Sequence, residues 1–400
     1  MVKNQPPHAR EVRVIHIPFR SRSPGRTAIL ASVLLSVLPS GLEAQDGVRL
    51  SPGCPECRIH LDTMVVLGET DGPGMIESEG NIVEVDPEGR FYVMGQQSTS
   101  VKVFSPQGRF LGAIGRDGEG PGEFRWTYTL DLDAEGRIWI GDVILSRIAV
   151  FDPEHRLERT IPVRGFMLAG DVFPFRGDSV LVGGYSMTPE LLGRAVHLLS
   201  PDGHRARSFG EPPHPVEGPD PHGYMRSVAP ARNGGIWVAS RDRYLIEHWS
   251  EEGDRMAILR RDVDWFEPLP ASAGDPPPPR AFLRSISQDP DGLLWVTLGV
   301  PGGRWREAAE RDPGSPHGWR MVDEDLWMTT VVEVIDPERG QVLASVRLPR
   351  RATSVFGDWL IGETRIDVDA GRVEIAVMRM ELRDGGRGRA GEAEARSGLR

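Results

Sequence analysis

The stretch DAEGRIWI (133–140) combines an acidic turn that ends in glycine with a strand whose third position is aromatic. The same pattern recurs in three clear copies, DPEGRFYV (86–93), RNGGIWV (232–238) and DPDGLLWV (289–296). Two weaker copies are RGDSVLV (176–182) and FGDWLIG (356–362). Acidic turns that end in glycine join strands, and a pattern that returns at intervals is typical of repeat proteins. The sequence therefore predicts six structural repeats.

A second turn follows each of the first five copies, and it begins at residues 105, 152, 200, 250 and 336. Each repeat therefore holds two hairpins with alternating apolar residues, which makes four short antiparallel strands. The intervals are 47, 48 and 50 residues until an insertion stretches the last one to 86. Four strands in each such interval, without helices, are typical of a β-propeller blade. We predict an all-β fold, a six-bladed β-propeller of four-stranded antiparallel blades.

The two ends of the repeat region complement each other. The sixth repeat stops after VEIAVMRMEL (373–382), without a fourth strand, whereas IHLDTMVVLGE (59–69) is a lone strand before the first repeat. We expect this N-terminal strand, about 61–69, to complete the last blade and close the ring. Closure would remove the free sheet edges that otherwise invite aggregation.

The glycine-rich stretch IGRDGEGPGEF (114–124) resembles a phosphate-binding loop at first sight. Such a loop needs converging backbone N–H groups with a nearby lysine, but Pro121 has no N–H, and Glu119 and Glu123 would repel a phosphate. Glycine instead permits the positive φ of a sharp turn. We interpret the stretch as the crossing from the outer strand of one blade to the innermost strand of the next.

The repeated D-x-x-G-x-[ILF]-[WY]-V core and the GxGPGEF connector resemble those of bacterial secreted six-bladed β-propeller proteins related to the NHL-repeat group. The resemblance covers about 61–382. It implies a fold and an exported location, periplasmic or secreted, but no reaction.

The rest of the chain divides into three further segments. RTAILASVLLSVLPSGLEAQ (26–45) has a short apolar run and a small-residue end, so we interpret 1–44 as a signal peptide with a long n-region. That run is too short for a permanent membrane anchor. Residues 45–60 are expected to form a linker that carries the CPEC pair, and 383–400 a disordered tail.

The charge and the cysteines narrow the classes of partner. Removal of 1–44 takes 6 of the 47 Lys and Arg and 2 of the 58 Asp and Glu, which leaves a net charge of −15 and argues against nucleic acid. Cys54 and Cys57 are expected to form a disulfide in an oxidising compartment. Arg58 stands where a c-type haem site would need histidine, and no further cysteine is present for a zinc site.

Long loops are expected on one face of the propeller, where the channel opens, including the insertion 299–328. Trp305, Trp319 and Trp327 in this insertion could grip a sugar or peptide, or bury the loop against the rim. Arg226 and Arg284 occupy equivalent positions of innermost strands, where they could clamp a carboxylate or a sulfate-like group. The alternative is that each arginine pairs with a neighbouring acidic residue.

Six-bladed lactonases of the gluconolactonase and regucalcin type are the enzymes to compare. Glu79 in ESEGNIVEV (77–85) resembles their first-blade metal ligand, and His222 could join other loop histidines on a metal, but their Pro-Asn-Gly motif is missing. We therefore expect an exported, monomeric binding module for a small molecule, glycan or protein, with no resident cofactor. The alternative is a hydrolase or lyase with a divalent metal in the channel.

Overall fold

A computed structural model describes most of the chain from residue 47 to residue 384. The described residues are 47–69, 71–76, 81–95, 97–133, 135–165, 167–175, 179–185, 190–191, 193–211, 225–266, 276, 278–315, 318–356, 360–367 and 372–384. All of them belong to one unit, 42–400. The expected signal peptide lies outside the described residues, and of the expected tail only residues 383 and 384 are described.

The first four blades follow one another along the chain, and each strand pairs with the one before it. Blade 1 consists of β4 (Asn81–Val85), β5 (Phe91–Gly95), β6 (Val101–Phe104) and β7 (Phe110–Ile114). Blade 2 consists of β8 (Thr127–Leu132), β9 (Ile138–Asp142), β10 (Arg147–Phe151) and β11 (Leu157–Pro162). Blade 3 consists of β12 (Met167–Pro174), β13 (Val180–Tyr185), β14 (Val196–Leu199) and β15 (Arg205–Phe209), and blade 4 of β16 (Arg226–Pro230), β17 (Ile236–Ser240), β18 (Leu245–Trp249) and β19 (Arg255–Arg260).

Blades 5 and 6 contain the two interruptions of the repeat. Blade 5 is β20 (Phe282–Gln288), β21 (Leu294–Pro301), β24 (Met328–Asp336) and β25 (Gln341–Arg347), with the one-turn helix η3 (Asp264–Phe266) before it and an insertion of η4 (Trp305–Ala308), β22 (Ala309–Arg311), β23 (Trp319–Met321) and α1 (Glu324–Trp327). Blade 6 is β26 (Ala352–Phe356), β27 (Leu360–Asp367), β28 (Arg372–Arg383) and the N-terminal β3 (Arg58–Leu67).

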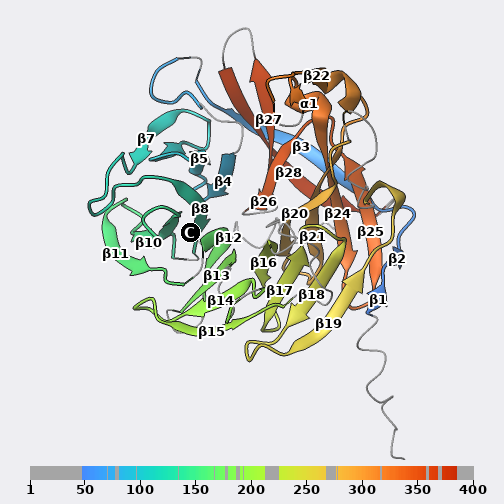
Figure 1. Cartoon of the computed structure of the whole chain (residues 1–400), viewed down its shortest axis with the longest axis horizontal. Helices are drawn as coiled ribbons and strands as arrows, with labels where there is room; N and C mark the ends of the chain where they lie inside the picture. Colours follow the sequence, from blue (N-terminus) through green and yellow to red (C-terminus); the bar gives the residue numbers. More distant parts are fainter. Residues whose placement is uncertain are drawn as a thin grey trace, which may run out of the picture. The chain divides into compact units, whose positions relative to one another are not determined.

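The six blades form a ring around the innermost strands β4, β8, β12, β16, β20 and β26 (Figure 1). Each of these strands contacts the next, and β26 contacts β4. Six hydrophobic clusters each combine buried side chains of two adjacent blades, as Tyr92 of blade 1 does with Ile140 of blade 2. The all-β, six-bladed fold expected from the sequence is confirmed.

The closing strand is also confirmed. β3 pairs antiparallel with β28, from Leu67 opposite Ile375 to Arg58 opposite Arg383. The strand therefore begins three residues before the expected position 61 and ends at Leu67, because the pairing with β28 continues toward the disulfide.

The repeated acidic turn has a hydrogen-bonding explanation. The carboxylate of Asp133 accepts a bond from the backbone N–H of Arg137 at 2.8 Å and another from Nε1 of Trp139 at 3.0 Å. Asp289 accepts from Nε1 of Trp295 at 2.9 Å in the same way, and Asp86 from the hydroxyl of Tyr92 at 3.0 Å. A buried Trp or Tyr needs a partner for its polar atom, and the turn carboxylate provides one.

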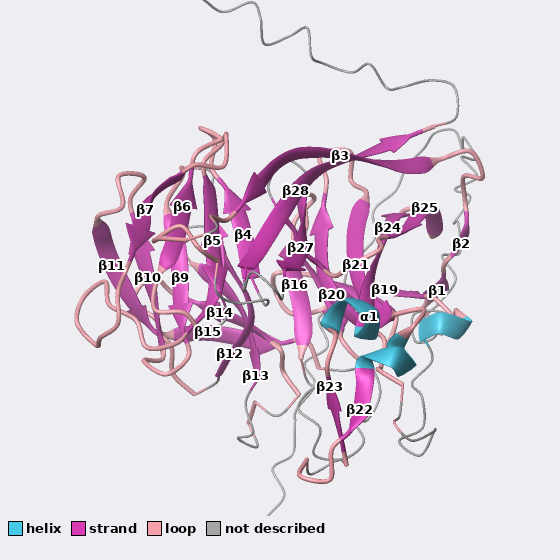
Figure 2. Ribbon diagram, turned by 90° about the horizontal axis from the view of Figure 1, so that it is seen from above, coloured by secondary structure: helices cyan, strands magenta, loops and turns pink. Residues whose placement is uncertain are grey.

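Parts of the segment 45–60, which we expected to be a linker, take part in the sheets. β1 (Val48–Arg49) pairs parallel with β19 of blade 4, and β2 (Ser51–Pro52) pairs parallel with β25 of blade 5. The N-terminal segment thus runs along the outer edges of blades 4 and 5 before β3 enters blade 6 (Figure 2). Two-residue strands have too little pattern to be predicted from sequence.

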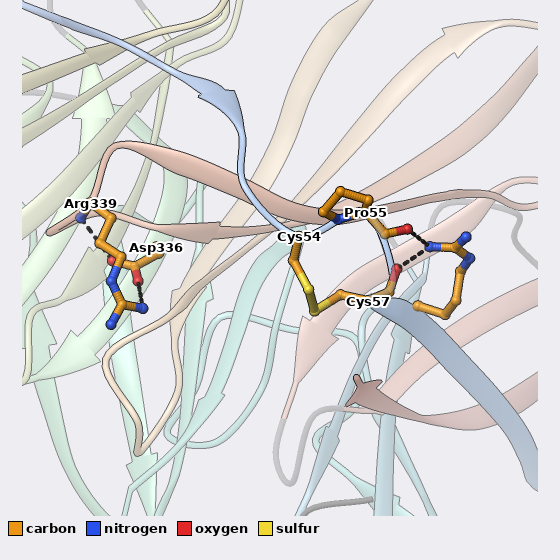
Figure 3. Close-up of a disulfide and its surroundings, with 6 residues drawn as sticks. Cys54, Pro55, Cys57, Asp336 and Arg339 are labelled. Atoms are coloured by element: carbon orange, nitrogen blue, oxygen red, sulfur yellow. Dashed lines mark hydrogen bonds and ion pairs between the residues drawn. A yellow bond between two sulfur atoms is a disulfide. The ribbon is translucent and has the colours of Figure 1, made fainter. Parts of the chain in front are cut away.

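A disulfide joins Cys54 and Cys57 between β2 and β3 (Figure 3). The guanidinium of Arg58 donates to the carbonyl oxygens of Pro55 at 2.6 Å and of Cys57 at 2.7 Å. The disulfide therefore lies in the short turn that leads from the outer edge of blade 5 to the closing strand.

The glycine-rich stretch forms the crossing from β7 to β8. Gly115 has a φ of +84°, and a Cβ there would lie 2.5 Å from the ring of Phe124. The carboxylate of Glu123 accepts the backbone N–H of Gly120 at 2.8 Å and Nε of Arg116 at 2.9 Å. Glu123 thus accepts hydrogen bonds from the donors that a phosphate would need. The stretch serves as a turn between the two blades.

Candidate ligand site at the axis of the ring

The innermost strands of the first three blades each carry a carboxyl group. Glu84 lies on β4, Asp131 on β8 and Asp171 on β12. Glu84 is paired across the sheet with Tyr92, and Asp131 with Trp139, so the two carboxyls share one register position. Asp131 is 9 % exposed, whereas Glu84 and Asp171 are half-buried. We call these three residues the carboxyl half of the axial cluster.

The other three blades contribute arginines. Arg241 directly follows β17 of blade 4, Arg284 lies on β20 of blade 5, and Arg351 directly precedes β26 of blade 6. The guanidinium carbons of Arg241 and Arg284 lie 5.0 Å and 5.1 Å from the centre of the Phe282 ring. All three arginines are half-buried. We call them the arginine half of the axial cluster.

Local backbone contacts hold the arginine half in place. Arg284 sits at an irregularity of the β20–β21 pairing, between Leu283 and Ser285. The carbonyl oxygen of Arg241 accepts the N–H of Leu283 at 3.1 Å, and that of Arg284 accepts the hydroxyl of Ser227 at 2.7 Å. Blades 4 and 5 are thus joined at the positions from which the two arginines project.

The arginine half brings three guanidinium groups together. Burial, with Arg351 and Arg241 nearby, lowers the pKa of Arg284 to about 9. Arg351 forms an ion pair with Glu324 of α1. In the described part of the chain, the Arg284 guanidinium has a ring contact but no ion pair or hydrogen bond. A half-buried guanidinium without an acceptor favours the binding of an anion.

The carboxyl half brings three acidic groups together, and their pKa values are raised. Burial, then the charge of Asp171, raises the pKa of Glu84 to about 8. Burial, then Glu84 and Asp171, raises the pKa of Asp131 well above its usual value. Burial also raises the pKa of Asp171 to about 6, although the N–H of Val228 and the charge of Arg241 oppose this rise. At neutral pH Glu84 therefore holds a proton, whereas Asp171 is mostly ionised.

The two halves meet at Asp171. Its Oδ2 accepts the N–H of Val228 on β16 at 3.1 Å, and its charge interacts with Arg241. Arg241 also interacts with the ring hydroxyl of Tyr128 on β8. Ionisable groups from all six blades thus form one series around the ring, with acids on blades 1 to 3 and arginines on blades 4 to 6.

Of the two arginines predicted from the sequence, only Arg284 belongs to this cluster. Arg226 is 3 % exposed, and the charges of Asp242 and Glu247 of its own blade act on it. Burial raises the pKa of Glu247 to about 7, and Arg255, 3.0 Å away, and Arg226 oppose the rise. Arg226 lies on the same sheet face as Val228, which packs against blade 3, and Ser227 between them lies on the opposite face.

The three tryptophans of the insertion contact one another. The rings of Trp305 and Trp327 are 6.0 Å apart, those of Trp319 and Trp327 are 5.2 Å apart, and all three are half-buried. Glu324 of the adjoining helix α1 is paired with Arg351. The insertion therefore adjoins the arginine half, and β22, β23 and α1 lie on one side of the blades (Figure 2).

The metal candidates cannot be placed. Glu79 and His222 lie outside the described residues. Among the side chains that the structure describes, no group of three or more His, Cys, Asp or Glu is arranged to hold a metal ion. The described part of the chain also contains no helix long and apolar enough to cross a membrane.

One signal in the sequence could have revealed part of the axial cluster. Glu84 and Asp131 each stand two residues before the turn aspartate, in the sequences EVD (84–86) and DLD (131–133). Because side chains two apart share a sheet face, the repeat predicts that these acids lie on equivalent inner positions. Arg241 and Arg351 lie in connections without a repeated pattern, so no such signal exists for them.

The comparisons with known proteins support the fold. Residues 59–167 match the model of the DUF5128 family, described as a 6-bladed beta-propeller. A DUF4221 family member from Bacteroides vulgatus superposes with a TM-score of 0.57 and 10% identity, over 82% of this chain and 99% of that one. A Bacteroides fragilis protein, provisionally described as exported, gives 0.54 and 8%, over 84% and 99%.

A gluconolactonase from Xanthomonas campestris is a more distant match, with a TM-score of 0.46 and 13% identity over 83% of this chain and 97% of that one. The comparison with curated proteins found no match. The relation to the NHL-repeat group stays a prediction. The chain is a six-bladed β-propeller protein, similar in fold to bacterial propeller proteins.

Proposed function

We propose that this protein is an exported binding module that takes a small carboxylate ligand at the arginine half of its axial cluster. Arg284 is the residue on which the proposal depends, with Arg241 and Arg351 beside it. A guanidinium can bind a carboxylate through two parallel hydrogen bonds. Ligand binding of this kind suits a rigid ring on which the binding side chains come from several blades.

The charge of Arg284 is the observation that supports this proposal. Its pKa of about 9 means that burial and two neighbouring arginines disfavour its charged form. An anion that binds beside Arg284 would relieve this repulsion, so the site gains more from a carboxylate than an exposed arginine would. Phe282, whose ring both Arg241 and Arg284 cover, adds an apolar surface for the body of the ligand.

The insertion provides a wall for the same site. Its helix α1 is joined to Arg351 through Glu324, and its three tryptophans form one half-buried group. We therefore assign the tryptophans the role of holding α1 beside the arginines. Export is part of the proposal, on the basis of the N-terminal apolar segment and the cysteine pair.

The test is calorimetric binding of straight-chain carboxylates, from propionate to octanoate, to the mature protein and to Arg284→Gln. We expect the variant to bind at least about tenfold more weakly, which corresponds to about 1.4 kcal/mol. Arg156→Gln is the matched control, because Arg156 lies in the outer turn of blade 2 and its side chain is 73% exposed. Treatment with a chelator should leave the affinity unchanged, because the arginines need no metal.

Two results would contradict the proposal. One is the absence of carboxylate binding by a folded protein. The other is equal affinity of Arg284→Gln and the unmodified protein. A fall in affinity for Arg156→Gln as large as that for Arg284→Gln would mean that carboxylates bind through net charge rather than at the axis.

A further inference from the structure

We propose that the ligand carries a primary ammonium group as well as a carboxylate, and that Glu84, Asp131 and Asp171 bind the ammonium while Arg284 binds the carboxylate. The inference rests on the proposed function, since it extends the same ligand across the axis of the ring. The chemical class is therefore a zwitterion, such as an amino acid or a short peptide with a free amino end.

The placement of the three carboxyls supports this inference first. They lie on the innermost strands of three successive blades, opposite the blades that carry the arginines. Asp171 connects the halves, because its Oδ2 accepts the N–H of Val228 from blade 4. A ligand that bound to Arg284 would therefore have acidic groups within the same ring, on the far side of Arg241.

An unsatisfied acceptor supports the inference independently. Asp131 is 9 % exposed, and its Oδ2 has no hydrogen-bond partner in the described part of the chain. A buried acceptor without a donor costs free energy comparable to a lost hydrogen bond. A primary ammonium has three donors and no acceptor, so it suits a site made of carboxyl oxygens alone.

The electrostatics agree with an organic cation. The charges of two further residues shift the pKa values of the carboxyl half. Asp133 raises the pKa of Asp131 further, and Arg241 opposes the rise in the pKa of Asp171. Because Glu84 holds a proton at neutral pH when the site is empty, a bound ammonium takes the place of that proton. The displaced proton passes from a carboxyl group to the buffer, and the carboxylate that remains forms the ion pair.

The experiment compares two matched series of probes on the full mature chain. One is the ω-amino acids from glycine to 8-aminooctanoic acid, and the other is the straight-chain carboxylates in which a methyl group replaces the ammonium. Calorimetry at pH 7 in two buffers of different ionisation enthalpy gives the affinity and the number of protons released. The series covers many separations of the two charges, so no assumption about the length of the ligand is needed.

We expect at least one amino acid to bind about tenfold or more tightly than its matched carboxylate, which is about 1.4 kcal/mol. Proton release should accompany the binding of that amino acid and not of the carboxylate. In Glu84→Gln and Asp131→Asn the affinity ratio should fall to about one. These substitutions mimic the protonated carboxyls, so we expect the variants to fold; the proton count on the unmodified protein needs no variant.

The possible failures are distinguishable. If carboxylates bind through Arg284 but no amino acid of any length binds more tightly or releases protons, the zwitterion inference is wrong and the proposed function stands. If neither series binds, or if Arg284→Gln changes nothing, the proposed function itself is wrong. An affinity ratio that stays high in both carboxyl variants would also overturn the inference.

Discussion

Asp131 and Asp133 lie two residues apart at the end of β8, yet their surroundings differ. Asp133 accepts hydrogen bonds from two backbone N–H groups, from Nε of Arg137 and from the ring of Trp139. Asp131 has neighbouring carboxyls instead, and its Oδ2 has no donor among the described residues. The acid of the repeated turn thus stabilises the blade, whereas the acid beside it is a buried carboxyl with an oxygen that the described residues leave without a donor.

The same contrast recurs in blade 1. Asp86 accepts bonds from the backbone and Nε of Arg90 and from the hydroxyl of Tyr92. Two residues earlier, Glu84 has a raised pKa because it is buried and faces Asp171. An uncompensated buried ionisable group is costly, and strongly shifted pKa values cluster at functional sites.

The largest effect should come from breaking the turn. Asp133→Asn would place an amide that donates where the carboxylate accepts from Arg137 and Trp139, and we expect a loss of about 2–3 kcal/mol in the free energy of unfolding. Asp131→Asn, the matched control two residues away, should leave the stability unchanged or raised at pH 8. Urea unfolding of both variants measures the difference. Equal losses in the two variants would show that the contrast does not exist.

A pH dependence of stability follows from the carboxyl half. Because the folded protein holds Glu84 and Asp171 at pKa values of about 8 and about 6, it binds more protons than the unfolded chain above pH 4.5. The free energy of unfolding should therefore fall as the pH rises from about 5 to 8. His197 acts in the opposite direction at lower pH, because burial lowers its pKa to about 3, so its contribution is lost as the pH falls below 6.5.

The variant Asp171→Asn sharpens this prediction. Removal of the negative charge of Asp171 should lower the pKa of Glu84 and flatten the fall in stability between pH 6 and 8. Thermal unfolding across that range, for the variant and the unmodified protein, gives both slopes. A stability that rises with pH in this window would show that the carboxyls are compensated in the folded state.

The smallest effect should come from the disulfide. Cys54 and Cys57 enclose only two residues, and a loop so short removes little entropy from the unfolded chain, about 2 kcal/mol at most. The double variant Cys54→Ser/Cys57→Ser should keep the fold and the carboxylate affinity, because the disulfide lies at the outer edge of the ring. If proteolysis cleaved β28 in the double variant, blade 6 would not be closed. That result would show that the disulfide contributes more to the fold than we expect.

The sequence predicted most of the fold and only part of the site. The turn aspartate, the glycine and the aromatic ring recur because blades 1, 2 and 5 use the same hydrogen bond from the ring to the turn, and a short-range repeat of this kind can be recognised in the sequence. Arg284 could be predicted as a candidate because it stands at a fixed sequence distance from Trp295. Arg241 and Arg351 were not found, because only the closure of the ring brings their connections beside Arg284. Arg226, the other predicted arginine, lies beside Asp242 and Glu247 of its own blade, because position along a strand does not say which neighbours a side chain meets.

The most direct test of the account is an NMR titration of the Arg284 side chain. The Nε–Hε signal of Arg284 can be assigned in the ¹⁵N-labelled protein by its absence from Arg284→Gln, and followed while butyrate is added at pH 7. We expect this signal to shift and saturate at the same concentration that calorimetry reports. Saturable binding that moves other signals and leaves that of Arg284 in place would contradict a carboxylate site at the axis of the ring.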